Sequence, residues 1–125
     1  MQATDRKRIA VLIDAENTSS KYIDLILSEI DPYGAVTYMR IYGNSNALLG
    51  WKDAALDHAM TPIMQFNYTS GKNASDSALI IDAMDILYTG IAEGFCLITS
   101  DSDFTKLAIR LREVSRYHCL TTMRL

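Results

Sequence analysis

The sequence predicts an α/β fold, a three-layer sandwich in which helices cover both faces of a central parallel sheet. Strand-like apolar runs alternate along the chain with segments of helical spacing, which is the pattern of parallel βαβ units. The first run, RIAVLID at Arg8–Asp14, is apolar from Ile9 to Ile13, as expected of a strand covered on both faces. The length of 125 residues is that of one domain, so we expect a single domain over residues 1–125.

After the first strand, a helix is predicted in SSKYIDLILSEIDPYG, residues 19–34. Its apolar residues recur every three or four positions, and Pro32 ends it because the residue before a proline avoids helical backbone. The face expected to pack on the sheet contains Tyr22, Leu25, Ile26, Glu29 and Ile30. The run AVTYMRIYG at Ala35–Gly43 is the second predicted strand.

The rest of the chain continues this alternation. The predicted elements are, in order, a weak helix at 48–59, a strand at 61–66, a helix at 76–90, a strand at 94–101 and a helix at 103–114. A polar loop, NYTSGKNAS, precedes the helix at 76–90, which ends at a glycine. The last residues, SRYHCLTTMRL, are poorly patterned and predict at most a short fifth strand.

Composition and charge narrow the class of protein. A net charge of -3 argues mildly against a broad cationic surface for nucleic acid, although it permits a local basic rim. The apolar runs are far shorter than the ~20 residues of a membrane span, and the amino terminus lacks the chemistry of a signal peptide. Cys96 and Cys119 have no spacing typical of zinc or of a disulfide framework. We therefore expect a cytoplasmic protein with no membrane segment.

Acidic residues follow two of the predicted strands. Asp14 ends the first strand in VLIDAEN, and Asp101 ends the fourth in LITSD, with Asp103 two residues later. In an open parallel sheet, ligands bind at the carboxyl ends of the strands, near the point where strand order reverses. If the first and fourth strands are neighbours, as in the usual doubly wound orders, these carboxylates converge.

A third candidate acid for this site lies in the helix predicted at 76–90. Helical spacing puts Asp76 on the same face as Leu79, Ile80, Ala83 and Leu87, which must pack on the sheet. As the first residue of that helix, Asp76 has an alternative interpretation as a simple N-cap. Asp82 and Asp85 are predicted to point away from this face, toward solvent.

Four carboxylates in one crevice repel one another unless a cation lies between them. A hard divalent ion with oxygen ligands is the usual solution, which favours Mg²⁺ or Mn²⁺. Zinc is not expected, because His58 and His118, in the second helix and the tail, are predicted to lie at the surface. The sequence therefore predicts one magnesium or manganese site.

Three segments together resemble the NYN domain family, of the LabA-like kind, within the PIN-like ribonuclease superfamily. They are LIDAEN, GKNASDSALIIDAMDILY and GFCLITSDSDFTKLAIRLRE, and the likeness covers about residues 9–113 in the same order. It implies a Rossmann-like (PIN-like) sheet, an aspartate cluster that binds Mg²⁺ or Mn²⁺, endoribonuclease activity and the capacity to pair as a homodimer. The tail at 114–125 departs from the family, because it lacks the usual glycine-containing turn and apolar strand.

The resemblance also implies roles for individual residues. The catalytic and metal-binding set is Asp14, Asp76, Asp101 and Asp103. Asn17 matches the asparagine that follows the first aspartate of the family, and Lys72 matches a basic residue suited to a phosphate. Both, with Ser100, are predicted to bind substrate. Asp82 matches a recurrent aspartate of the family.

The expected chemistry is metal-dependent cleavage of RNA phosphodiester bonds, and it needs no side-chain nucleophile. Ser100 and Ser102 have no histidine partner in the sequence pattern, so we interpret them as turn residues or as hydrogen-bond donors to phosphate. Further candidates for contact with single-stranded RNA are Arg40, Lys52, Tyr42, Trp51 and Tyr68, although a core position is the commoner role for each aromatic residue. The alternative is a catalytically idle RNA- or protein-binding module with the same fold.

Overall fold

The computed structural model describes residues 6–65, 73–101, 104–114 and 119–120, with backbone alone for 73–77, 112–114 and 119–120. It contains a five-stranded, all-parallel sheet with the strand order β3-β2-β1-β4-β5. The strands are β1 (Arg8–Asp14), β2 (Ala35–Gly43), β3 (Thr61–Met64), β4 (Gly94–Ile98) and β5 (Cys119–Leu120). The first and fourth strands are therefore neighbours, as the sequence predicts.

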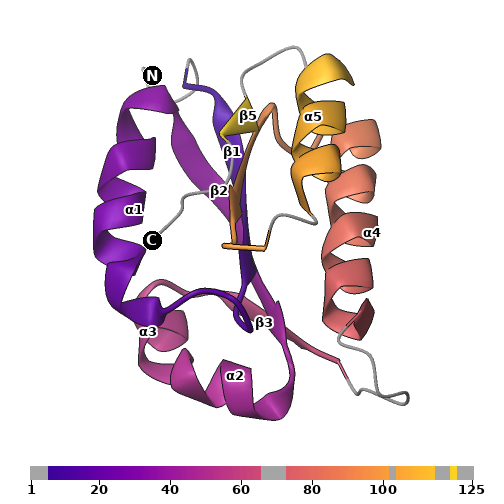
Figure 1. Ribbon diagram of the computed structural model, residues 1–125. Coiled ribbons are helices and arrows are strands. Elements are labelled where there is room, and N and C mark those ends of the chain that lie inside the picture. Colours follow the sequence, from indigo (N-terminus) through magenta and orange to yellow (C-terminus); the bar gives the residue numbers. More distant parts are fainter. Residues whose placement is uncertain (1–5, 66–72, 102–103, 115–118, 121–125) are drawn as a thin grey trace.

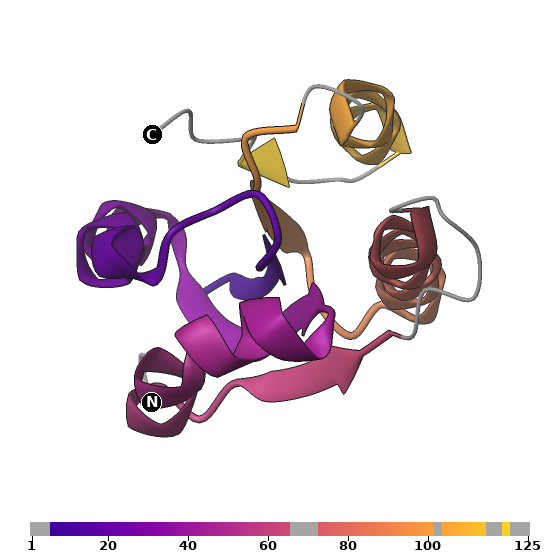
Figure 2. The ribbon, with the colours of Figure 1, turned by 60° about the horizontal axis from the view of Figure 1, so that its bottom comes forward.

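Helices cover both faces of the sheet, so the predicted three-layer sandwich is confirmed. One face carries α1 (Ile23–Ile30) and the short α2 (Ser45–Gly50) and α3 (Lys52–Asp57), and the other carries α4 (Asn73–Thr89) and α5 (Thr105–Val114) (Figures 1 and 2). Alternate residues of β1 enter the two cores. Ala10 and Leu12 pack on the side of α4 and α5, whereas Val11 and Ile13 pack on the side of α1.

The bounds of β1 and β2 match the prediction, and the main local differences are in the helices. The face of α1 that packs on the sheet consists of Ile23, Ile26 and Ile30, whereas Leu25 is exposed. The single helix predicted at 48–59 is wrong, because the chain forms α2 and α3 with a break at Trp51. The indole of Trp51 is buried and donates from Nε1 to the Thr18 carbonyl at 3.1 Å, so core packing of this side chain accompanies the break.

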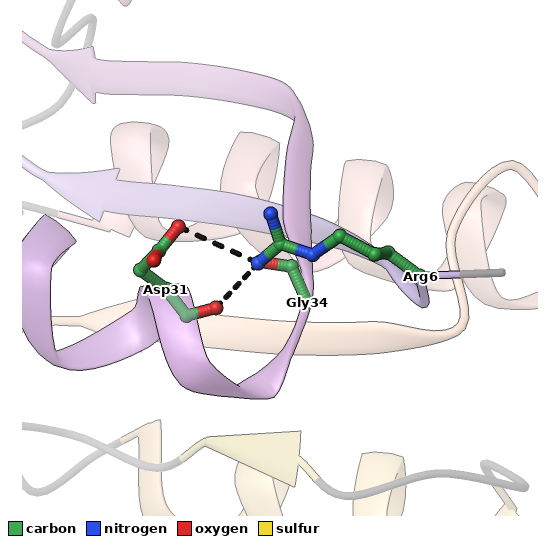
Figure 3. Close-up of polar contacts among 3 residues, drawn as sticks. All are labelled: Arg6, Asp31 and Gly34. Carbon is green, nitrogen blue, oxygen red and sulfur yellow. Dashed lines mark hydrogen bonds and ion pairs between the residues drawn. The ribbon is translucent and has the colours of Figure 1, made fainter. Parts of the chain in front are cut away.

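The start of β1 is attached to the turn that follows α1. The Arg6 guanidinium donates from Nη2 to the carbonyl oxygens of Asp31 at 2.5 Å and Gly34 at 2.8 Å, and it lies 3.4 Å from the Asp31 carboxylate (Figure 3). A Cβ at Gly34 would collide with the Lys7 carbonyl oxygen, which accepts from the Ala35 amide. Glycine is thus needed where β2 begins beside β1.

The last strand is short but present. In β5, Cys119 lies opposite Phe95 and Leu120 lies opposite Cys96, so the tail adds a two-residue strand at the edge of the sheet. The tail thus contains the short fifth strand that the sequence left open. Among the helices in the described ranges, none has both the length and the apolar character required to cross a bilayer.

Candidate functional site

Asp14 is a buried acid at the carboxyl end of β1. The residue is 2% exposed and lies two positions after Leu12, so its side chain is on the face of the sheet covered by α4. Three groups donate hydrogen bonds to this carboxylate: the Glu16 amide to Oδ1 at 3.2 Å, Asn17 Nδ2 to Oδ2 at 2.8 Å and Thr99 Oγ1 to Oδ2 at 2.7 Å. These donors compensate the cost of burying a charged group.

Thr99 connects this acid to Asp101. Its hydroxyl donates to Asp14 and accepts from the Asp101 amide at 3.0 Å, and the residue is 1% exposed. The ends of β1 and β4 are therefore joined by one side chain. Sequence reasoning missed Thr99; the available signal was a hydroxyl residue on the buried face just before the strand-end acid.

Asn17 and Ser100, both predicted to bind substrate, join the loops after β1 and β4. Ser100 donates from its hydroxyl to the Asn17 carbonyl at 2.5 Å and from its amide to the same oxygen at 3.3 Å. Close by, the Thr18 hydroxyl donates to the Ile98 carbonyl at 3.3 Å. The loop after β1 is thus attached to β4 and its loop at several points, which stiffens the surroundings of Asp14.

Three predicted site residues lie wholly or partly outside the described residues. Asp103 and Lys72 fall in undescribed segments, and only the backbone is described at Asp76. Because α4 starts at Asn73, residue 76 is its fourth residue, and the interpretation of Asp76 as the N-cap is wrong. Helical spacing puts this position one turn before the buried Leu79, at the end of α4 that lies near the carboxyl ends of the strands (Figure 1).

Asp82 occupies a different environment from the one predicted. It accepts hydrogen bonds at Oδ2 from Arg40 Nη1 at 2.9 Å and from the Tyr42 hydroxyl at 2.7 Å. The prediction that Asp82 points to solvent is wrong, because the buried face of α4 is centred on Leu79, Ala83 and Ile86 and includes position 82. The expected burial of Ile80 is also wrong, since it is 40% exposed.

The cluster of Tyr38, Arg40, Tyr42 and Asp82 lies between β2 and α4. The Arg40 guanidinium is 4.6 Å from the centroid of the Tyr38 ring, a cation–π distance. Burial, and then the hydrogen bond to Asp82, raise the pKa of Tyr42 well above its usual value. The neutral phenol is therefore the stable form of Tyr42 in the fold.

Most of the other candidate RNA contacts have structural partners. Tyr42 and Trp51 are buried, so the interpretation of both as core residues is confirmed, and Arg40 is paired with Asp82. Lys52 is exposed on α3, and Tyr68 lies outside the described residues. His58 is partly exposed and its Nε2 is 3.0 Å from the Asp24 carboxylate, whereas His118 is not described.

A metal site built from described side chains alone is not found: within the parts of the chain that the structure covers, no three His, Cys, Asp or Glu side chains gather closely enough to hold an ion. The Thr99 hydroxyl joins the Asp14 carboxylate to the backbone amide of Asp101, and both residues carry hard oxygen ligands. The side chains of Asp76 and Asp103 are not among those that the structure describes. The structure thus brings the ends of β1 and β4 together at Asp14 and the Asp101 backbone, and the metal-binding set stays a prediction.

Comparison with known proteins is consistent with this architecture. The family model of the NYN domain matches residues 8–123. A crystal structure of a protein of unknown function from Vibrio parahaemolyticus RIMD 2210633 superposes with a TM-score of 0.65 at 18% sequence identity, covering 97% of this chain and 83% of that one. This likeness shows the fold alone. No curated protein sequence matches the chain.

Proposed function

The chain belongs to the NYN domain family of PIN-like nucleases, and from this premise we propose that it is a metal-dependent endoribonuclease that cleaves single-stranded RNA. The observation that carries the proposal is the link from Asp14 through the Thr99 hydroxyl to Asp101 at the adjacent ends of β1 and β4. In a parallel sheet this end is where ligands bind. The proposed compartment is the cytoplasm, and a homodimer stays a prediction from the sequence.

The residues present suit a hard divalent cation. An ionised carboxylate has about four acceptor sites, and the three hydrogen bonds to Asp14 leave one of them available. Asp14 and Asp101 carry carboxylate oxygens as possible ligands, and so do Asp76 and Asp103, the other two members of the proposed set. Such a set favours Mg²⁺ or Mn²⁺ over zinc.

In this proposal, Asp14, Asp76, Asp101 and Asp103 hold the cation. When bound, it supplies a water ligand of lowered pKa and stabilises the charge that develops on a phosphoryl oxygen. Asn17 orients the Asp14 carboxylate through its amide, and Lys72 contacts a backbone phosphate. The Ser100 hydroxyl is engaged with the Asn17 carbonyl, which supports a role in loop geometry and not as a nucleophile.

The test is cleavage of end-labelled single-stranded RNA by the purified protein. We expect cleavage with Mn²⁺, loss of cleavage with a chelator, and weaker binding of RNA as salt rises. Asp14→Asn and Asp76→Asn should each lower the rate by several orders of magnitude, whereas the matched control Asp85→Asn, on the exposed face of α4, should leave it nearly unchanged. Cleavage that survives both the chelator and Asp76→Asn would identify a contaminating nuclease.

The second candidate function is an idle RNA- or protein-binding module. One observation favours it: hydrogen bonds from Glu16, Asn17 and Thr99 already compensate the charge of Asp14. A stable apo site therefore does not require a cation at this carboxylate. RNA binding without cleavage, across several RNAs and with both Mg²⁺ and Mn²⁺, would support this candidate.

A further inference from the structure

The hydroxyl of Thr99 has both of its roles assigned by its neighbours. A hydroxyl carries one proton, and the Asp101 amide, which can only donate, directs its hydrogen at Thr99 Oγ1 over 3.0 Å. The Thr99 proton is then directed at Asp14 Oδ2 over 2.7 Å. With the residue 1% exposed, bulk water has almost no access to replace either contact.

These contacts make the two oxygens of Asp14 unequal. Oδ2 accepts from Thr99 at 2.7 Å and from Asn17 at 2.8 Å, so both of its acceptor sites are occupied. Among the described residues, Oδ1 accepts from the Glu16 amide alone, at 3.2 Å, and keeps one site. A cation at Asp14 is therefore limited to Oδ1.

We propose that Thr99 is a positioning residue that restricts Asp14 to one-oxygen coordination and thereby makes the site select Mg²⁺ or Mn²⁺ over Ca²⁺. The inference rests on the metal dependence in the proposed function. Ca²⁺ accepts about six to eight oxygens and readily takes both oxygens of a carboxylate, whereas Mg²⁺ requires near-octahedral geometry. Blocking Oδ2 removes the two-oxygen mode that suits the larger ion.

The test measures selectivity and does not depend on RNA cleavage. Mn²⁺ is bound to the protein, and its displacement by Mg²⁺ or Ca²⁺ is followed through the electron paramagnetic resonance signal of free Mn²⁺. In the wild type, Mg²⁺ should displace Mn²⁺ at lower concentration than Ca²⁺. Thr99→Val, which keeps the shape but removes the hydroxyl, should reduce this Mg²⁺-over-Ca²⁺ ratio by about tenfold.

Two further variants separate positioning from general stability. Thr99→Ser keeps the hydroxyl and should restore the ratio to within about threefold of the wild type. Thr89→Val is the matched control, because it removes a hydroxyl that donates to the Asp85 carbonyl within α4, and it should leave the ratio unchanged. If Thr99→Val does not fold, Thr99→Cys takes its place against Thr99→Ser, because a thiol is a similar size but a weak donor.

The outcomes distinguish this inference from the proposed function. A Thr99→Val protein with the wild-type ratio, or a wild type without preference for Mg²⁺ over Ca²⁺, overturns the role of Thr99 and leaves the nuclease proposal standing. A wild type that shows the predicted ratios but cleaves no RNA supports the role of Thr99 and contradicts the nuclease. A wild type that binds no Mn²⁺ overturns both.

Discussion

The Tyr42 hydroxyl donates to Asp82 Oδ2 at 2.7 Å and so connects β2 to the middle of α4. In the sheet, Tyr42 lies opposite Asp14 of β1. Arg40 donates to the same Asp82 oxygen at 2.9 Å, and the side chains of Arg40 and Asp82 are 32% and 20% exposed. This contact joins segments 40 residues apart in the chain. It holds α4, which carries Asp76, on the sheet.

Asp82→Ala should destabilise the fold. The change removes the carboxylate that accepts from both the Arg40 guanidinium and the Tyr42 hydroxyl, which are partly buried. Losing this acceptor should lower the free energy of unfolding by about 2 kcal/mol. Urea denaturation followed by circular dichroism measures the loss. The control Asp85→Ala, exposed on the same helix, should change stability by less than about 0.5 kcal/mol. Equal effects of the two substitutions would contradict a structural role for the cluster.

The raised pKa of Tyr42, caused by burial and by the hydrogen bond to Asp82, predicts an alkaline dependence of stability. The folded state keeps the phenol neutral, so its contribution is complete below the unfolded pKa of about 10 and declines as pH rises toward the folded pKa. Above about pH 10 the stability advantage of the wild type over Tyr42→Phe should shrink by about 1.4 kcal/mol per pH unit. Denaturation of both proteins between pH 8 and 11 measures this. A constant difference across that range would mean that Tyr42 titrates normally in the fold.

After α3 and α4 the chain has a residue with left-handed backbone, alanine at Ala59 and glycine at Gly90. Exchanging alanine and glycine at these two positions should therefore have opposite effects on stability. The end of α3 has the Schellman pattern, in which the Met60 amide donates to the Ala55 carbonyl at 2.9 Å, and Ala59 has a φ of 54° where glycine is favoured. Ala59→Gly should therefore raise the free energy of unfolding by up to about 1 kcal/mol, because the left-handed backbone costs alanine more than glycine. Thermal melts, with a shift of about 4 °C per kcal/mol, measure the change.

Gly90→Ala is the matched reverse change after α4. Gly90 has a φ of 71°, and nothing lies within 4 Å of a Cβ built on it, so the loss of about 1 kcal/mol should come from backbone strain alone. Shifts of the same sign for Ala59→Gly and Gly90→Ala would show that the left-handed backbone does not control stability at these positions.

Metal binding and charge removal should act on the same cluster of aspartates. Mn²⁺ at one hundred times its Kd should stabilise the wild type by about 2.7 kcal/mol if it binds only the folded state. Asp101→Asn should raise the Tm of the metal-free protein, because it removes one charge near Asp14, and it should reduce the shift produced by Mn²⁺. Differential scanning fluorimetry with Mg²⁺, Mn²⁺ and chelator measures both effects. If neither ion nor the substitution moves the Tm, the four acids do not form a cluster.

The sequence by itself determined the architecture and the end of the sheet at which Asp14 and Asp101 lie. The apolar run of β1 and the alternation of strands with helices predicted a parallel sheet, because parallel strands need crossover helices that cover both faces. The usual doubly wound order then put β1 beside β4, as the structure has it. The same rule predicted that Asp14 and Asp101 would lie at one end of the sheet. The end of a strand and the residue that follows it are local features of the sequence. This explains why the prediction for Asp14 and Asp101 was correct.

Only the tertiary structure decided which polar residues the fold buries and which groups pair with them. Asp82 lies on the buried face of α4 because Arg40 and Tyr42, 42 and 40 residues away in the chain, donate hydrogen bonds to its carboxylate. Thr99 acquires its role only when Asp14, 85 residues earlier, lies beside it. Periodicity measures where apolar residues recur, but the cost of burying a charge depends on donors that distant segments supply, and a local pattern contains no information about those donors.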